Sequence, residues 1–419
     1  MNYSNKLFIL SGIIFLTSFY SSANSQDTVK IMTYNLLNYG ANSLKDQSFR
    51  RVVNYSDPDI LVVEEILSQA DVNNFTNNVL NYYTPGLYSS GTFYNGFDSD
   101  NAVFYKTTEF TFLFNVEIPT ALRTINMFGL VHNSTFDTIR LFAVHLKAGN
   151  TAPDQEQRLT EVNILRNFTN TLPLNSEFVV LGDFNIYSST ESCYQRLLQP
   201  DIGVEGHFLD PYNLPGTWNQ QAYAPYHTQS TRTRSLGDGG ATGGLDDRFD
   251  MILNSKAVTE AGRIKYISGS LKPFGNDGNH FNDSINQRPN LAVPDSIADA
   301  LYYGSDHLPV TALYLFEQNQ VLVNNYSSEI PDEFILYQNY PNPFNPVTKI
   351  KYKVKQKSWV SIDVTDMTGR VYSNLVNKQI NPGSYETVFN GEFLSSGVYF
   401  YRMKVNGKIL NSKKMILTR

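Results

Sequence analysis

The sequence reads FVVLGDFN at residues 178–185. The four apolar residues from Phe178 to Leu181 are typical of a buried strand, and the glycine, aspartate and asparagine after them end it. Polar side chains at the ends of buried strands are where α/β proteins place functional groups. This segment therefore predicts a sheet whose strand ends carry a chemical site.

The same pattern recurs along residues 28–316. Polar side chains end or interrupt short apolar runs at Asn35, Glu64-Glu65, His145 and Asp250, and Ser305-Asp306-His307 opens the run at 308–316. Apolar residues at helical spacing predict a helix after Pro153-Asp154 and another over residues 72–83. Strands that alternate with helices indicate a layered α/β sandwich.

The strand ends offer oxygen and imidazole donors and no thiolate. They comprise four carboxylates, two amides and two histidines, namely Glu65, Asp183, Asp250, Asp306, Asn35, Asn185, His145 and His307. Hard oxygen ligands suit Mg²⁺, Mn²⁺ or Ca²⁺ better than zinc. Phosphodiester hydrolysis needs such an ion beside a histidine, because phosphoryl charge must be neutralised while a water loses its proton.

The order of these motifs resembles the endonuclease/exonuclease/phosphatase superfamily, which includes deoxyribonuclease I. The matching segments are Tyr34-Asn35, PDILVVEEI at 58–66, GDFN at 182–185, Arg248-Phe249-Asp250 and Ser305-Asp306-His307. The resemblance implies a four-layer α/β/β/α sandwich over residues 27–316. It also implies a divalent metal cofactor, Mg²⁺ with Mn²⁺ or Ca²⁺ as alternatives.

The resemblance assigns a role to each matched position. The residues expected at the metal are Asn35, Glu65 and Asp306. The residues expected in catalysis are His145, Asp183, Asn185, Asp250 and His307, with Asp183 and Asn185 positioning water and phosphate and Asp250 orienting His307.

Four further positions bear on the expected site, two as substrate-binding residues and two as positions expected to take no part in it. Arg123 is expected to bind a phosphate oxygen of the substrate, and Asn101 is expected to line the same cleft. Leu37 stands where some relatives carry an acid, so a second metal ligand is absent there. Glu64 neighbours Glu65 on one strand, and we expect its side chain to face away from the site.

The C-terminal part of the chain has a different charge and pattern. Residues 336–419 contain 13 Lys and Arg against 4 Asp and Glu, a net charge of +9, whereas the remainder carries −15. We place a linker at 317–334, which is rich in Gln, Asn and Ser. Alternating runs such as TKIKYKVK at 348–355, separated by turn signals, predict a small β-sandwich over 335–419.

This segment resembles a type A sorting domain of the type IX secretion system, which implies an immunoglobulin-like β-sandwich. The motifs that match are YPNPFNP at 340–346, DMTGR at 366–370, LSSGVYFYRM at 394–403 and KKMIL at 413–417. Residues 1–25 look like a signal peptide, because Lys6 precedes an apolar stretch that ends in small residues. We therefore expect a secreted or cell-surface protein that meets the type IX secretion machinery and has no stable membrane span.

Together these features predict a secreted, divalent-metal-dependent phosphodiesterase. We favour an extracellular endonuclease that hydrolyses DNA or RNA, with Arg123, Arg232, Arg234 and Arg248 as a basic strip for the nucleic-acid backbone. The charge of −15 outside the sorting segment weakens this choice, because duplex binding is normally supported by a basic surface. The alternative is a phosphoesterase for lipid head groups or small organic phosphates. The retained acids, amides and histidines argue against an inactive binding protein on this fold.

Overall fold

The structure of the protein is a computed structural model. It describes residues 26–40, 43–96, 98–135, 137–317, 331–369, 371–391 and 394–418. The expected signal peptide at 1–25 lies outside the described residues, as does most of the expected linker, residues 318–330.

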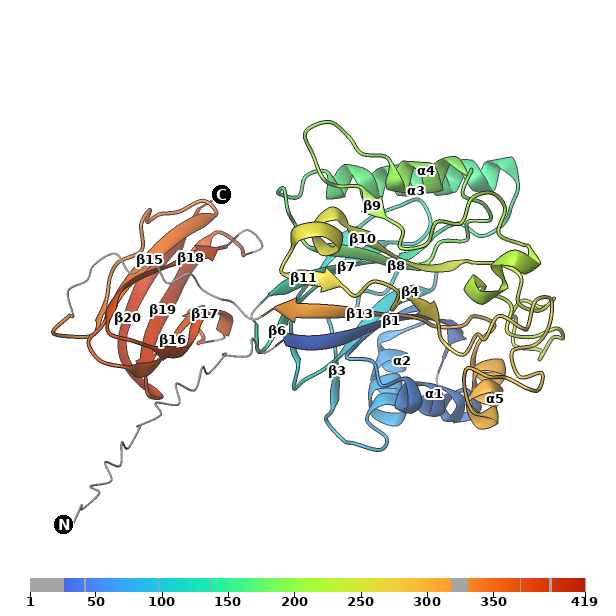
Figure 1. Ribbon diagram of the computed structural model, residues 1–419, viewed down its shortest axis with the longest axis horizontal. Coiled ribbons are helices and arrows are strands. Elements are labelled where there is room, and N and C mark those ends of the chain that lie inside the picture. The colour runs from blue at the N-terminus through green and yellow to red at the C-terminus, as the bar shows by residue number, and fades with distance from the viewer. Residues whose placement is uncertain are drawn as a thin grey trace, which may run out of the picture.

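Two β-sheets pack face to face in the large N-terminal unit (Figure 1). Within the described residues the first sheet has the order β11-β13-β1-β2-β4-β3, with β12 beside β13; its strands are β1 (Gln26–Tyr39), β2 (Ile60–Ile66), β3 (Tyr88–Ser90), β4 (Asp100–Lys106), β11 (Ile264–Tyr266), β12 (Lys272–Pro273) and β13 (Val310–Glu317). The second sheet has the order β5-β6-β7-β8-β10-β9; its strands are β5 (Phe110–Ile118), β6 (Ile125–His132), β7 (Thr138–His145), β8 (Phe178–Asp183), β9 (Phe208–Leu209) and β10 (Asp250–Ser255).

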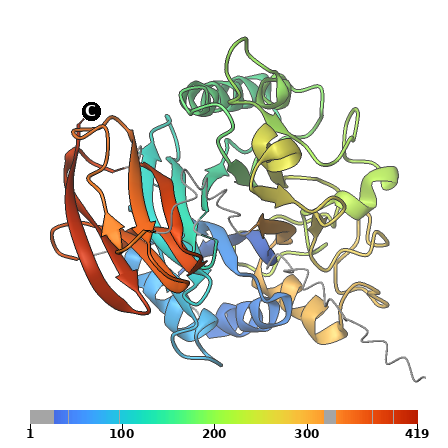
Figure 2. The ribbon, with the colours of Figure 1, turned by 60° about the vertical axis from the view of Figure 1, so that its left-hand side comes forward.

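Helices cover the outer face of each sheet (Figures 1 and 2). Those on the first sheet are α1 (Ser43–Ser56), α2 (Gln69–Asn74), η1 (Phe75–Leu80) and α5 (Asp295–Gly304). Those on the second sheet are α3 (Ala152–Thr169) and α4 (Ser192–Leu198), and two short turns of helix, η2 (Gln221–Tyr226) and η3 (Ala257–Ala261), lie in the connections. The predicted four-layer α/β/β/α sandwich is confirmed. The helix predicted over residues 72–83 ends at Leu80, and Tyr83 lies exposed beyond it.

Strand alternation creates three apolar layers. In β1 and β2, Ile31 and Val62 face the space between the sheets, whereas Met32 and Val63 face the helices. Leu181 of β8 faces the same space from the second sheet. Because side chains two residues apart share a face, the inter-sheet face continues at the strand ends into polar positions.

The C-terminal unit is a β-sandwich with its own core, as predicted. One sheet has the order β14-β15-β18, with strands β14 (Ile335–Leu336), β15 (Val347–Val354) and β18 (Gly383–Asn390). The other has the order β17-β16-β19-β20, with strands β16 (Ser358–Thr365), β17 (Val371–Ile380), β19 (Gly397–Val405) and β20 (Lys408–Leu417). Ile350, Tyr352 and Val354 of β15 are buried in this core while the lysines between them face outward.

None of the helices in the described part of the chain is long and apolar enough to cross a membrane.

Candidate active site

Three acidic and imidazole side chains lie side by side because their strands pair in register. His145 at the end of β7 pairs with Asp183 at the end of the parallel strand β8. Asp183 also pairs with Asp250, the first residue of the antiparallel strand β10. Each of the three follows the inter-sheet face of its strand, so the side chains converge where the sandwich opens.

Gly182 allows this close arrangement of β7 and β8. Its φ is +133°, and a Cβ at this position would lie 2.0 Å from the carbonyl oxygen of Val144. No other residue type fits beside that carbonyl without moving the strand. The glycine of the GDFN motif is therefore a structural requirement of the site.

Glu65 reaches the site through an irregularity in β2. Strict alternation would turn it toward the helices, like Val63, but the pairing of β1 and β2 shifts register here and the φ of Glu65 is +58°. Positive φ is unfavourable for a residue with a side chain, and such backbone is concentrated at functional sites. The backbone N–H of Asn38 donates to Glu65 Oε2 at 2.8 Å and fixes the carboxylate.

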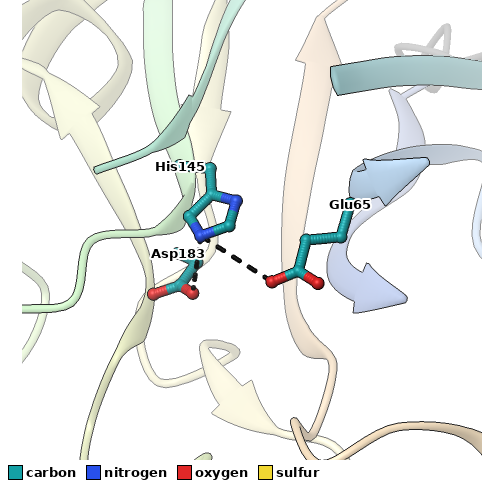
Figure 3. Close-up of side chains that lie close together, drawn as sticks. All are labelled: Glu65, His145 and Asp183. Carbon is teal, nitrogen blue, oxygen red and sulfur yellow. Dashed lines mark ion pairs between the residues drawn. The ribbon is translucent and has the colours of Figure 1, made fainter. Parts of the chain in front are cut away.

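Glu65, His145 and Asp183 form the first cluster (Figure 3). His145 Nε2 lies 3.7 Å from Glu65 Oε1 and 3.6 Å from Asp183 Oδ2, which is too long for hydrogen bonds. Burial and the nearby cations of Arg123 and His307 hold the pKa of His145 well below its usual value. The imidazole is therefore neutral near pH 7 and does not form ion pairs with the two acids.

Asn35 links the two carboxylates of this cluster. Its Nδ2 donates to Glu65 Oε1 at 3.0 Å and to Asp183 Oδ2 at 3.2 Å. Its Oδ1 accepts the backbone N–H of Leu37 at 2.9 Å, which fixes the orientation of the amide. Asn35 thus lies beside the two acids, with its nitrogen rather than its oxygen toward them.

Asp183, Asp250 and His307 form the second cluster, which shares Asp183 with the first. His307 Nδ1 lies 2.8 Å from Asp250 Oδ2, and His307 Nε2 lies 3.8 Å from Asp183 Oδ2. Burial acts to lower the pKa of His307, but the carboxylates of Asp250, Asp306 and Asp183 outweigh it and raise that pKa well above its usual value. Burial raises the pKa of Asp183 to about 7.

Gln229 contacts His307, although the sequence did not predict it as a site residue. Its side-chain amide lies 2.6 Å from His307 Nε2 and 3.3 Å from Asp306 Oδ2. The preceding Thr228 accepts the backbone N–H of Asp250 on its hydroxyl at 3.0 Å. Both residues lie in the connection before β10, where no apolar run or strand end marks them.

The two remaining polar strand-end residues lie at the edges of the clusters. Asp306 Oδ2 accepts the backbone N–H of Ala241 at 2.7 Å, and its buried Oδ1 has no hydrogen-bond partner among the described residues. Asp306 belongs to neither cluster. Asn185 donates its backbone N–H to Asp183 Oδ1 at 3.0 Å and its amide to Leu146 O at 3.2 Å, so it orients the carboxylate and lines its far side.

The two expected substrate-binding residues lie on the His145 side. Arg123 pairs with Asp98 at 3.0 Å, and its side chain is 19% exposed. Asn101 is buried, and its amide donates to the carbonyl of Thr124 at 3.1 Å. Asn101 therefore supports the segment that carries Arg123.

The predicted basic strip is wrong at two of its four arginines. Arg232 is fully buried and binds both oxygens of Asp238 at 3.0 Å. Arg248 is also buried and pairs with Asp210 at 2.8 Å. A buried guanidinium that already pairs with a carboxylate is not available to a nucleic-acid backbone.

The prediction that Glu64 faces away from the site is wrong. Its side chain points into the space between the sheets, where a Cβ at Gly182 would lie 3.0 Å from Glu64 Oε1. Thr33 donates its hydroxyl to Glu64 Oε1 at 2.8 Å, and Glu64 Oε2 is buried without a hydrogen-bond partner in the described part of the chain. Burial raises the pKa of Glu64 well above its usual value. The folded protein therefore keeps a proton on Glu64 that the unfolded chain releases.

We expect Glu64→Gln to stabilise the protein in alkaline solution. A raised pKa in the folded state makes stability fall as pH rises above the unfolded value near 4.5, and the neutral amide removes that loss. The melting temperature at pH 8 in EDTA should rise by about 2–4 °C for each kcal/mol gained, and the gain should shrink toward pH 5. The exposed Glu260→Gln is the control. An unchanged melting temperature at pH 8 would contradict a protonated Glu64.

Comparisons with known proteins identify the C-terminal unit. Residues 338–418 match the family described as the secretion system C-terminal sorting domain. This domain points to the type IX secretion machinery, and the protein is secreted or located at the cell surface. No curated protein matches the sequence.

Several solved structures are similar to large parts of this chain. A truncated Caenorhabditis elegans TDP2 aligns over 68% of this chain and 97% of that chain, with 16% identity and a TM-score of 0.43. An endonuclease/exonuclease/phosphatase family protein from Bacteroides thetaiotaomicron aligns over 70% and 97%, with 15% identity and a TM-score of 0.42. One from Beutenbergia cavernae aligns over 93% and 100%, with 13% identity and a TM-score of 0.41. The predicted resemblance of the C-terminal segment to a sorting domain is confirmed by the family match.

Proposed function

We propose that this exported protein is a divalent-metal-dependent phosphodiesterase, and specifically an endonuclease that acts on DNA or RNA. The observation that carries the proposal is the position of Asp183 between two histidines. Its Oδ2 lies 3.6 Å from the neutral His145 and 3.8 Å from the protonated His307. A carboxylate with a pKa of about 7 beside a protonated imidazole suits a reaction that removes a proton at one point and delivers it at another.

The donors of the first cluster fit a hard divalent ion. The ligand atoms of Glu65, His145 and Asp183 lie within 4.8 Å of one another, and no direct hydrogen bond joins His145 to either acid. Mg²⁺ prefers one or two carboxylate ligands and keeps several waters. The distances of 3.6 and 3.7 Å between His145 Nε2 and the two carboxylate oxygens agree with an ion or a water between them. We assign Glu65 as the main ligand, while the amide nitrogen of Asn35 donates to the Glu65 and Asp183 carboxylates and orients them. Asp306, which belongs to neither cluster, stays a predicted ligand. When bound, the ion neutralises charge on the phosphoryl oxygens.

The chain's own residues supply the proton transfers. Asp183, with a pKa of about 7, is poised to take a proton from the attacking water near neutral pH, and Asn185 keeps its carboxylate oriented. His307, held at Nδ1 by Asp250, presents a protonated Nε2 to the leaving oxygen. His145 lies on the other side of Asp183 from His307, with Arg123 near it, and these two residues bind the phosphoryl oxygens.

Cationic side chains on two sides of the centre favour a nucleic-acid substrate. Arg123 lies on the His145 side, and Lys45 of α1 donates to the carbonyl of Leu37 at 2.7 Å on the Asn35 side. A chain of phosphates can contact both sides at once, whereas a small phosphate ester reaches only the centre.

A comparison of four substrates tests this function. We expect the wild-type protein to cleave plasmid DNA or RNA with Mg²⁺ or Mn²⁺ and to lose this activity in EDTA. Sphingomyelin and p-nitrophenyl phosphate should be turned over much more slowly. Rapid turnover of sphingomyelin or p-nitrophenyl phosphate without detectable cleavage of DNA or RNA would reject the endonuclease and favour a lipid or small-molecule phosphoesterase.

A further inference from the structure

A hollow of about 680 Å³ lies between α1, α5 and the loop that contains Leu236 and Asp238. Its walls include the cationic side chains of Lys45 and Arg51 and the aromatic ring of Tyr303. The volume is in the range of pockets that bind a ligand of nucleotide size.

Hydrogen bonds link both walls of the hollow to residues of the active site through one intervening segment each. On the α1 side, Lys45 donates to Leu37 O at 2.7 Å, and Leu37 N–H donates to Asn35 Oδ1 at 2.9 Å. On the loop side, Ala241 follows Asp238 by three residues and donates its N–H to Asp306 Oδ2 at 2.7 Å. The hollow therefore lies beside the catalytic centre, on the side of Asn35 and Asp306.

The charges in the hollow favour an anion. Both oxygens of Asp238 bind Arg232 at 3.0 Å, and Asp299, a second acid on the wall, pairs with Arg288 at 3.0 Å. These acids are therefore neutralised by arginines of their own. Arg51 is exposed and makes no ion pair with the described residues. The guanidinium is available to a phosphate group of a ligand.

Tyr303 adds a flat surface beside these cations. Its side chain is 51% exposed although it belongs to α5, and the edge of Tyr302 packs against it with ring centroids 4.9 Å apart and an interplanar angle of 82°. A half-exposed ring held by a neighbour is a stacking platform for another planar group. Cations that track a backbone next to an aromatic ring are the usual combination for an unpaired nucleotide.

We propose that this hollow binds the nucleotide next to the scissile phosphodiester, with its phosphate at Lys45 and Arg51 and its base on Tyr303. The base faces of a duplex are covered by their neighbours, so the site selects single-stranded DNA or RNA. This inference rests on the proposed function and specifies the substrate class of the same centre.

The test compares two double variants. Arg51→Ala with Tyr303→Ala removes the cation and ring of the hollow. Arg50→Ala with Tyr82→Ala is the matched control, because Arg50 is the neighbouring residue of α1 and stacks on Tyr82 at 4.0 Å outside the hollow. All four substitutions are at the surface or near it, and thermal unfolding verifies that both variants fold.

We expect the KM for a single-stranded oligonucleotide to rise by about ten- to hundredfold in the first variant and to stay near wild type in the control. The fall in kcat/KM should be at least about tenfold larger for the oligonucleotide than for bis(p-nitrophenyl) phosphate, which is too small to fill the hollow. Tyr303→Phe should keep the wild-type KM, since stacking needs the ring and not the hydroxyl. Anisotropy of a labelled oligonucleotide with the EDTA-treated protein should show the same order of affinities.

Two failures are distinguishable. If the wild-type protein cleaves the oligonucleotide but both double variants have the same KM, the hollow is not a nucleotide subsite while the proposed function stands. Equal wild-type kcat/KM for single-stranded and duplex DNA would likewise overturn the inference. If the wild-type protein hydrolyses bis(p-nitrophenyl) phosphate but neither DNA nor RNA, the endonuclease assignment itself fails.

Discussion

His307→Ala is expected to lower kcat for phosphodiester hydrolysis by about 10²–10⁴-fold, the range that general acid–base catalysis contributes. The imidazole is buried, its Nδ1 lies 2.8 Å from Asp250 Oδ2, and its protonated Nε2 faces Asp183. Alanine removes the proton donor and leaves both acids in place. Steady-state kinetics with an oligonucleotide and with bis(p-nitrophenyl) phosphate measure the loss.

The partner of His307 provides a second check on the same step. Asp250→Asn should produce a fall of similar size, and the double variant should fall little further, because residues that act as one unit are not additive. The half-buried His207, outside both clusters, is a suitable control as His207→Ala. Wild-type kcat in His307→Ala would remove this histidine from the mechanism.

Glu65→Gln is expected to reduce hydrolysis to background at any Mg²⁺ or Mn²⁺ concentration that supports the wild-type protein. A neutral amide is a poor ligand for a hard cation, and Glu65 is the acid that β2 turns into the site through its positive φ. The amide keeps the size of the carboxylate, so the melting temperature in EDTA should remain close to wild type.

Calorimetric titration with Mn²⁺ separates loss of the ion from loss of chemistry. Binding should weaken strongly in Glu65→Gln and remain unchanged in the exposed control Glu260→Gln. Full activity of purified Glu65→Gln would show that the ion, if required, is held elsewhere.

Much of the site follows from local sequence because it depends on strand alternation. His145 and Asp183 end buried strands, and their inward orientation follows from the apolar residues two positions earlier. Their pairing in register then brings the side chains together. The GDFN motif was informative because its glycine is required where β8 passes Val144.

The features that sequence could not provide depend on contacts between distant segments. Arg248 was predicted to bind the nucleic-acid backbone, but the carboxylate of Asp210, 38 residues away, neutralises it inside the fold. Gln229 contacts His307 from a connection 78 residues earlier in the chain. The bulge that redirects Glu65 is a property of the pairing of β1 with β2, so alternation alone would have turned this acid toward the helices.

The most direct test of the account is the rate at which wild-type protein hydrolyses bis(p-nitrophenyl) phosphate with Mn²⁺, after EDTA, and after Mn²⁺ is restored. We expect a measurable rate with the ion, loss of that rate in EDTA and recovery when Mn²⁺ is added in excess. Under all three conditions, Glu65→Gln should remain at background. A wild-type rate that EDTA leaves unchanged, or a purified protein without phosphodiester hydrolysis in either Mg²⁺ or Mn²⁺, would contradict a metal-dependent centre at Glu65, His145 and Asp183.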